Sequence, residues 1–306
     1  MNEIIYFQPN ASDPILEEND VFEIVRKYVK DVNEVDFVDE TGGESRVYSI
    51  NDKIILKVQR PNRLRNKTSL EKEAFFLKEL EKHEEIKSPH VYGYGKYKGI
   101  EYVCMSKIKG KAFKYLEVDL KKRKNILFEL GKTLYEIHSL DKKTFQESKL
   151  FPIDENLEDV LGRLNYRFVR NLKKLKGISD SELEYAKELG KNLINKITKI
   201  DCFVILHSNP ALSHTYVDSN FLFSGLIDYG DSFISHPIFD IKRWNLTDRV
   251  LILKGYFYKE KPTKNFIDIY NIVYTLDSII KILKNKGTIS SIKNINDILI
   301  TTNFII

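Results

Sequence analysis

The spacing of apolar residues changes part-way along the chain, and this change most constrains the fold. Before about residue 110, apolar residues fall in short runs rich in β-branched and aromatic side chains, whereas from Lys121 onward they recur every three or four positions. The first pattern is typical of strands and the second of helices. We therefore predict an α+β fold, with an antiparallel β-rich part over residues 1–108 and a mostly helical part over 109–306. Gly110 marks the turn between them.

Five segments of the first part are predicted to be strands: 34–40, 46–50, 53–59, 90–99 and 100–108. The second and third are separated by Asn51 and Asp52, which predict a two-residue turn, and the last two by Lys98 and Gly99, which predict a hairpin. Strands so closely connected pair antiparallel, so the first part should contain a small antiparallel sheet.

Helical spacing predicts an early helix over 20–32, capped by Asn19 or Asp20 and covering the core, and a second that Thr68 or Ser69 begins. The main predicted helices are 20–32, 69–83, 124–140, 157–175, 179–200 and 266–283. Short apolar strands between Phe203 and Asp231 interrupt the helical part.

Composition places the chain among folded globular proteins, because 42% of its 306 residues are hydrophobic and 30% are charged. The net charge of +5 is modest and the basic runs carry no interleaved aromatic residues, so we expect no nucleic-acid partner. Only Cys104 and Cys202 are present, which excludes a disulfide framework or a Cys-rich zinc site. Without a leader or a long apolar run, we expect a cytoplasmic protein, monomeric or homodimeric, with no membrane partner.

Two neighbouring motifs carry the chemistry: LHSNPALSHTYVD, ending at Asp218, and GLIDYGDSFISHP, which begins at Gly225. Their order and spacing resemble the aminoglycoside-phosphotransferase superfamily, in which a loop like H-G-D-x-x-x-x-N precedes I-D-x-G-D. The resemblance extends in ordered motifs over 35–244. It implies a bilobal protein-kinase-like fold, binding of ATP and Mg²⁺, and phosphoryl transfer to a hydroxyl of a small molecule.

Lys57 lies in the apolar run IILKV, where a buried ammonium requires an anionic partner. The resemblance assigns it to the ATP phosphates together with Glu73 on the following helix. Glu71 is the competing partner, and an edge-strand lysine reaching water is the alternative explanation for Lys57. The resemblance also assigns the turn at Gly42 and Gly43, whose backbone N–H groups can approach phosphate, to nucleotide binding.

Met105, next to the boundary between the two parts, completes the predicted nucleotide site. Asp228 ends an apolar strand and offers the hard oxygen ligands that Mg²⁺ requires, although an Asp in this place can also cap the turn that follows. His214 stands at the last position of the loop, as in the superfamily's 2″-phosphorylating members. We predict that His214 is a second metal ligand or a neighbour of the metal through water.

Asn209 occupies the position whose Asp normally accepts the proton of the acceptor hydroxyl. An amide can orient that hydroxyl but cannot take its proton, and losing a general base typically costs about 10²–10⁴-fold in rate. Two hypotheses follow: a phosphotransferase in which Asn209 and Asp228 are the catalytic residues, or a pseudokinase-like protein that binds nucleotide or ligand without transfer. Ser208, where Gly is usual, raises the prospect of a different loop shape.

The resemblance gives His207 and Asp240 structural roles beneath the loop, while His236 departs from the Asp usual before Pro237. Asp231 is expected to meet a second metal or to cap a turn. Substrate identity is open. The basic segment Arg163, Arg167, Arg170, Lys173 and Lys174 would suit an anionic acceptor, but a solvated helix face is the favoured explanation.

Overall fold

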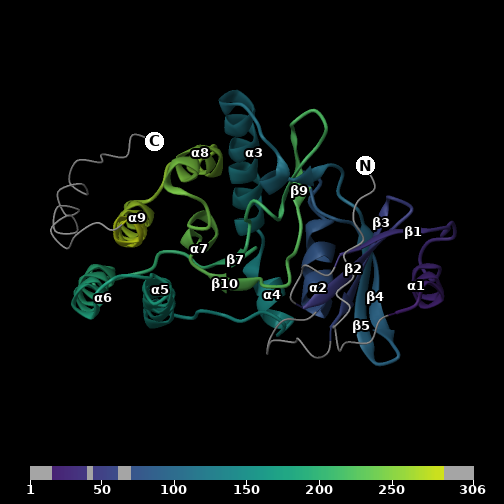
Figure 1. Cartoon of the computed structure of the whole chain (residues 1–306), viewed down its shortest axis with the longest axis horizontal. Helices are drawn as coiled ribbons and strands as arrows, with labels where there is room; N and C mark the ends of the chain where they lie inside the picture. The colour runs from purple at the N-terminus through teal and green to yellow at the C-terminus, as the bar shows by residue number, and fades with distance from the viewer. Residues whose placement is uncertain (1–15, 40–43, 61–69, 286–306) are drawn as a thin grey trace.

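The computed structural model describes residues 16–39, 44–60 and 70–285, and it has the predicted bilobal α+β architecture (Figure 1). Its first lobe is built on one antiparallel sheet in the order β1-β2-β3-β5-β4. The strands are β1 Val35–Asp39, β2 Ser45–Ile50, β3 Ile54–Gln59, β4 Val91–Tyr97 and β5 Ile100–Ser106. Each predicted strand is thus present within a few residues of its expected bounds.

One of the two predicted hairpin turns differs from expectation. Tyr97 pairs with Ile100 across Lys98 and Gly99, which have φ values of 48° and 80° and form the predicted two-residue turn. Ile50, however, pairs with Ile54, so the loop between β2 and β3 has three residues and not the predicted two. Asn51 and Asp52 both take positive φ there, which their short polar side chains tolerate.

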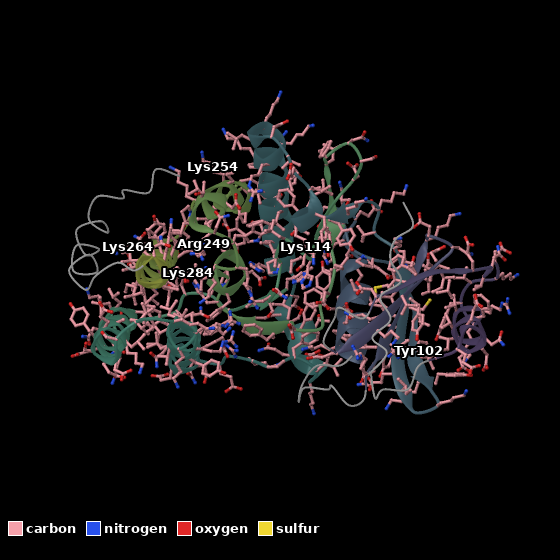
Figure 2. The ribbon with its side chains drawn as sticks, viewed as in Figure 1. Tyr102, Lys114, Arg249, Lys254, Lys264 and Lys284 are labelled. Atoms are coloured by element: carbon pink, nitrogen blue, oxygen red, sulfur yellow. The ribbon has the colours of Figure 1, made fainter. Side chains whose placement is uncertain are left out.

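Successive residues of β5 face two different helices because side chains alternate across a strand. Tyr102 and Cys104 belong to the apolar cluster on the side of α1 (Glu18–Val25), whereas Val103 and Met105 belong to the cluster that contains α2 (Leu70–Leu80). Tyr102, labelled in Figure 2, lies near α1 and its hydroxyl is 3.0 Å from that of Tyr28. The sheet is therefore buried on both faces.

The early helix is shorter than predicted and begins before the expected caps. It ends at Val25, and Glu17 is the N-cap, so Asn19 and Asp20 lie inside the first turn. Asp20 accepts a hydrogen bond from the Glu17 N–H, which completes a capping box. Val21, Ile24 and Val25 are buried against the sheet, as expected of a helix that covers this core. The predicted caps Thr68 and Ser69 of the second helix lie outside the described residues.

The second lobe consists mainly of helices (Figure 1). They are α3 Leu120–His138, α4 Lys142–Glu147, α5 Leu157–Leu172, α6 Asp180–Ile194, α7 Ile238–Ile241, α8 Leu246–Tyr256 and α9 Lys264–Lys284. The α3 and α8 backbones touch, since a Cβ at Gly131 would lie 2.0 Å from the Ile252 carbonyl oxygen and one at Gly255 would lie 1.9 Å from that of Phe128. Glycine is required at both positions.

Two small sheets hold the loop of the first motif between the lobes. One pairs β6 (Lys111–Ala112), β8 (Thr215–Val217) and β9 (Phe223–Leu226), and the other pairs β7 (Val204–Leu206) with β10 (Phe233–Ser235). The loop leaves β7 and enters β8, and the second motif begins within β9 and contains β10. Among the described helices, none is long and apolar enough to cross a lipid bilayer.

Candidate active site

Lys57 joins the two lobes through a pair of carboxylates. Its Nζ lies 2.8 Å from Oε2 of Glu73 on α2 and 2.6 Å from Oδ1 of Asp228, which follows β9. Lys57 is in the middle of β3, paired with Val47 and Val103, so its Cα is fixed by ladders on both sides. The competing partner considered above, Glu71, is exposed.

Burial and charge act in opposite directions on these groups. Burial disfavours the charged ammonium, but the two carboxylates outweigh it and raise the pKa of Lys57 above its ordinary value. Burial also acts to raise the pKa of Asp228, yet Lys57 and His214 lower it overall. Burial raises the pKa of Glu73 against the attraction of Lys57. With one ammonium between two carboxylates, the three groups carry a net negative charge that attracts a cation.

His214 aims one ring nitrogen at Asp228. Its Nδ1 lies 2.9 Å from the carbonyl oxygen of Asn209, which can only accept, so Nδ1 carries the hydrogen. In neutral imidazole, Nε2 then presents a lone pair, and it lies 3.3 Å from Oδ2 of Asp228. Two lone pairs at this distance require either a proton or a cation between them. This arrangement fits a divalent metal bound by Asp228 and His214.

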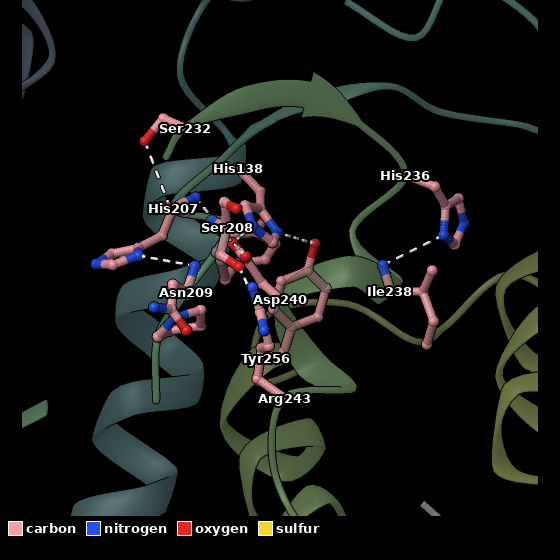
Figure 3. A network of polar contacts seen from close by, with 12 residues as sticks. His138, His207, Ser208, Asn209, Ser232, His236, Ile238, Asp240, Arg243 and Tyr256 are labelled. Carbon is pink, nitrogen blue, oxygen red and sulfur yellow. Dashed lines mark hydrogen bonds and ion pairs between the residues drawn. The ribbon is translucent and has the colours of Figure 1, made fainter. Parts of the chain in front are cut away.

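Asp240 fixes the beginning of the loop. Its Oδ2 accepts the N–H of His207 at 2.9 Å, and its Oδ1 accepts that of Ser208 at 2.6 Å. His138 Nε2, at 3.0 Å, donates to Oδ2, while Nδ1 of the same ring accepts the Tyr256 hydroxyl at 2.9 Å. Figure 3 shows Asp240 at the centre of these contacts, all of them buried. The loop is thereby fastened to α3 and α8.

His207 lies beneath the loop and is fully buried. Its Nε2 is 3.0 Å from the Ile227 carbonyl oxygen and its Nδ1 accepts the N–H of Asn209 at 3.2 Å, so the neutral ring bridges the two motifs. Burial lowers the pKa of His207 to about 4, which keeps the ring neutral at physiological pH.

Ser208 has a φ of 76°, the left-handed region that favours glycine. The superfamily motif has Gly at this position. Ser208 therefore adopts a backbone conformation that suits the Gly it replaces. The next residue, Asn209, is held by its backbone: its N–H bonds to His207 and its carbonyl to His214. Within the described residues, its side-chain amide makes no hydrogen bond, which leaves it available to a substrate.

The remaining predicted site residues are not partners in the polar contacts given above for Lys57, Asp228 and His214. Met105 is buried in the large apolar cluster near the end of β5, and its part in nucleotide binding stays a prediction. Gly42 and Gly43 lie outside the described residues. His236 is buried, and its Nδ1 accepts the N–H of Ile238 at 3.2 Å. Asp231, within the second motif, is half-buried.

The model of the phosphotransferase enzyme family, named APH, matches residues 39–257, which is more than two thirds of the chain. The chain belongs to this phosphotransferase family. The superfamily resemblance read from the two motifs is thereby confirmed. A search of curated proteins gives no significant match.

Solved structures of family members share the fold. The GDP and kanamycin complex of APH(2")-IIia superposes with a TM-score of 0.62 at 14% identity, covering 91% of this chain and 96% of that one. ADP-bound aminoglycoside phosphotransferase APH(2'')-Ib gives 0.57 at 19%, covering 92% and 97%. Macrolide 2'-phosphotransferase MphH from Brachybacterium faecium gives 0.59 at 14%, also covering 92% and 97%.

Sequence reasoning missed part of the support beneath the loop. His138, at the end of α3, and Tyr256, at the end of α8, are distant in sequence from both motifs, so no local pattern marks them. Arg243 and Trp244, which follow Asp240 in the sequence, also support the loop. Arg243 Nε donates to the Ser208 carbonyl at 2.9 Å, and Trp244 Nε1 to that of Pro210 at 2.6 Å.

Proposed function

We propose that this phosphotransferase-family protein transfers the terminal phosphoryl group of ATP to a hydroxyl of a small molecule, with Mg²⁺ as its metal. The observation that carries the proposal is the position of Lys57, which meets Glu73 and Asp228 at the junction of the lobes beside His214. The nucleotide-bound relatives support the choice of a nucleotide donor. We further propose residues 1–108 as the nucleotide lobe and 109–306 as the lobe of the loop and substrate.

Each residue has a role that its chemistry supports. Lys57, oriented by Glu73, neutralises phosphate oxygens of ATP, and the Gly42-Gly43 turn and Met105 complete its site. Asp228 and His214 would hold Mg²⁺, which would neutralise the charge that develops on the transferring group. Metal binding by Asp228 would replace its contact with Lys57.

Asn209 orients the acceptor hydroxyl toward the phosphorus. The bond from the terminal phosphorus to the bridging oxygen breaks and a bond to the acceptor oxygen forms. Because an amide accepts no proton, the hydroxyl proton passes to a phosphoryl oxygen or to water. Transfer through a loose transition state depends mostly on positioning and charge neutralisation, so the reaction tolerates the loss of a base at reduced rate.

The test compares ADP formation by the wild type and by Asp228→Ala over aminoglycosides, sugars and amino alcohols. We expect acceptor-dependent ADP formation from the wild type and its loss in Asp228→Ala. Equal rates in the two proteins would exclude the proposed transfer.

A second candidate function is nucleotide or ligand binding without transfer, and Asn209 is the observation that favours it. The variant Asn209→Asp separates the two. If the wild type transfers slowly, restoring a carboxylate should raise its rate by about 10²–10⁴-fold. A variant that binds ATP and remains inactive would favour the binding protein.

A further inference from the structure

Several cations converge beside the loop from two elements. Arg163, Arg167 and Arg170 lie on one face of α5, since they are four and three residues apart. Arg163 and Arg167 are half-buried, so the expectation of a solvated helix face is wrong for these two. It is right for Arg170, Lys173 and Lys174, which are exposed.

The ring of Phe239 is the meeting point of this cluster. The Arg163 Cζ lies 6.0 Å from its centroid, the Arg167 Cζ 4.9 Å, and the Nζ of Lys242, which follows α7, 5.6 Å. Three positive charges, two from α5 and one from the residue after α7, therefore surround a single aromatic side chain. Phe239 directly precedes Asp240, the residue that fixes the loop.

Two nearby carboxylates, Asp154 and Asp240, are already engaged, while the charge of Asp231 acts on Arg243. Arg163 donates twice to Asp154, with Nε 2.7 Å from Oδ2. Asp240 accepts hydrogen bonds from His138 and from two backbone N–H groups. Arg167, in contrast, has no hydrogen-bond acceptor among the residues that the structure describes. Its guanidinium packs on Phe239 and has all its donors available.

The pKa values of Arg167 and Lys242 are both lowered, as expected where positive charges lie close together. Burial, followed by the charges of Arg243 and Arg163, lowers the pKa of Arg167 to about 10. Burial likewise lowers the pKa of Lys242 to about 8, and Arg167 adds to the effect although Asp277 opposes it. These cations disfavour one another, and a bound anion would relieve the repulsion.

Arg243 contacts the loop that carries Asn209. Its Nε donates to the Ser208 carbonyl at 2.9 Å, one residue before Asn209 (Figure 3). The residue itself is exposed. When Nε of an arginine is hydrogen-bonded, the N–H groups of its two Nη atoms remain free to donate side by side in a fixed geometry, like a fork. Such a fork matches carboxylate and phosphate oxygens in two parallel hydrogen bonds.

We propose that Arg167 and Arg243 form an anion subsite for the acceptor, so that the hydroxyl substrate carries a carboxylate or phosphate ester. This inference rests on the proposed transfer reaction and specifies its acceptor. Polycationic aminoglycosides, such as the kanamycin bound in one relative, would meet repulsion at this position.

Binding is measured first, in the full chain, without requiring turnover. With Mg²⁺ and a non-hydrolysable ATP analogue saturating the nucleotide site, pyrophosphate is titrated by calorimetry. We expect wild-type binding that weakens by at least about tenfold in Arg167→Gln and in Arg243→Gln. Arg243→Lys, which keeps the charge, should retain part of it, and Lys174→Gln, an exposed cation just beyond α5, should bind as the wild type.

Absence of pyrophosphate binding by the wild type, or equal affinity in Arg167→Gln and Lys174→Gln, would overturn the subsite. A thermal melt of each variant confirms that it is folded at the temperature of the titration.

Activity is measured second, with glycerol, glycerate, glycerol 3-phosphate and kanamycin as acceptors. We expect the anionic acceptors to exceed glycerol in kcat/KM by at least about tenfold, and Arg167→Gln to lose this preference through KM. Preference for kanamycin would overturn the inference. If no acceptor is phosphorylated while pyrophosphate binds as expected, the transfer reaction fails and the anion subsite stands.

Discussion

Lys57 and Asp228, 171 residues apart in sequence, form an ion pair with a separation of 2.6 Å between Nζ and Oδ1. The pair connects the middle of β3 to the start of the segment that follows β9, and Glu73 is the third member. One ammonium therefore serves two carboxylates. If a ligand binds Asp228 and breaks its contact with Lys57, the Lys57 ammonium still has Glu73 as a partner. The triad can therefore rearrange without leaving a buried ammonium unpaired.

Changing Glu73 to Gln tests this relationship. We expect the KM for ATP to rise by at least about tenfold, because Lys57 is then held by Asp228 alone and is no longer oriented toward phosphate. The free energy of unfolding should change little, since one ammonium and one carboxylate remain. Steady-state kinetics and urea unfolding measure the two quantities. Glu71→Gln, exposed on the same helix, is the matched control, and an equal effect there would contradict the assignment.

The backbone at Ser208 predicts a stabilising substitution. A non-glycine residue with positive φ costs about 1 kcal/mol or more, and the φ of Ser208 is 76°. Ser208→Gly should raise the free energy of unfolding by up to about 1 kcal/mol, as measured by denaturant titration. Ser208→Ala keeps the Cβ and should give no gain. A gain in the Ala variant would assign the effect to the hydroxyl.

Asp240 is buried and binds the beginning of the loop. Its negative charge and two acceptor oxygens should contribute more to the free energy of unfolding than the shape of its side chain. Asn in its place has one acceptor oxygen and a donor amide, so a buried N–H or the His138 ring loses its acceptor. We expect Asp240→Asn to lower the free energy of unfolding by about 2–4 kcal/mol. Asp268→Asn, on the exposed face of α9, should change it by less than about 0.5 kcal/mol. Similar losses in both variants would refute a special role for Asp240.

The buried histidines predict how stability depends on pH. Burial lowers the pKa of His236, like that of His207, to about 4, against about 6.5 in an unfolded chain. Below pH 6.5 the unfolded state binds more protons, so stability present at neutral pH is lost as pH falls from about 6.5 to 4. Each histidine should contribute on the order of 3 kcal/mol to this loss.

The variant His236→Gln isolates one of these contributions. Its difference from the wild type in free energy of unfolding should shrink as pH is lowered through this range, because the variant has no buried imidazole to protonate. Chemical denaturation at a series of pH values measures the difference. His83→Gln, at a position whose side chain is 40% exposed, should follow the wild-type curve in parallel. A constant difference for His236→Gln would show that its ring is not buried in the neutral form.

The strands and most long helices could be predicted because their residues follow a regular period. The missed α8 shows where that reasoning ends. Asp248 and Arg249 are buried in it while Val250 is exposed, so its apolar residues do not gather on one face. Arg249 instead forms an ion pair with Asp277 on α9, a partner that no local pattern indicates. Tertiary pairing, and not amphipathic spacing, fixes this helix.

The same distinction applies to the site. Lys57, Glu73 and Asp228 could each be selected because they stand in recognisable motifs, but their mutual distances depend on how the lobes pack. Arg167 shows the converse case. In the sequence it is one of five basic residues in a run, and only its position against Phe239, next to the loop anchor, distinguishes it from its solvated neighbours.

Asn209 is held by its peptide groups, which bond to His207 and His214, and not by its side chain. Asn and Asp are nearly the same size, and their codons differ by one base. A single point mutation can therefore convert this position between amide and carboxylate without disturbing the fold. One nucleotide change therefore separates the wild type from Asn209→Asp, the variant that tests what a carboxylate adds at this position.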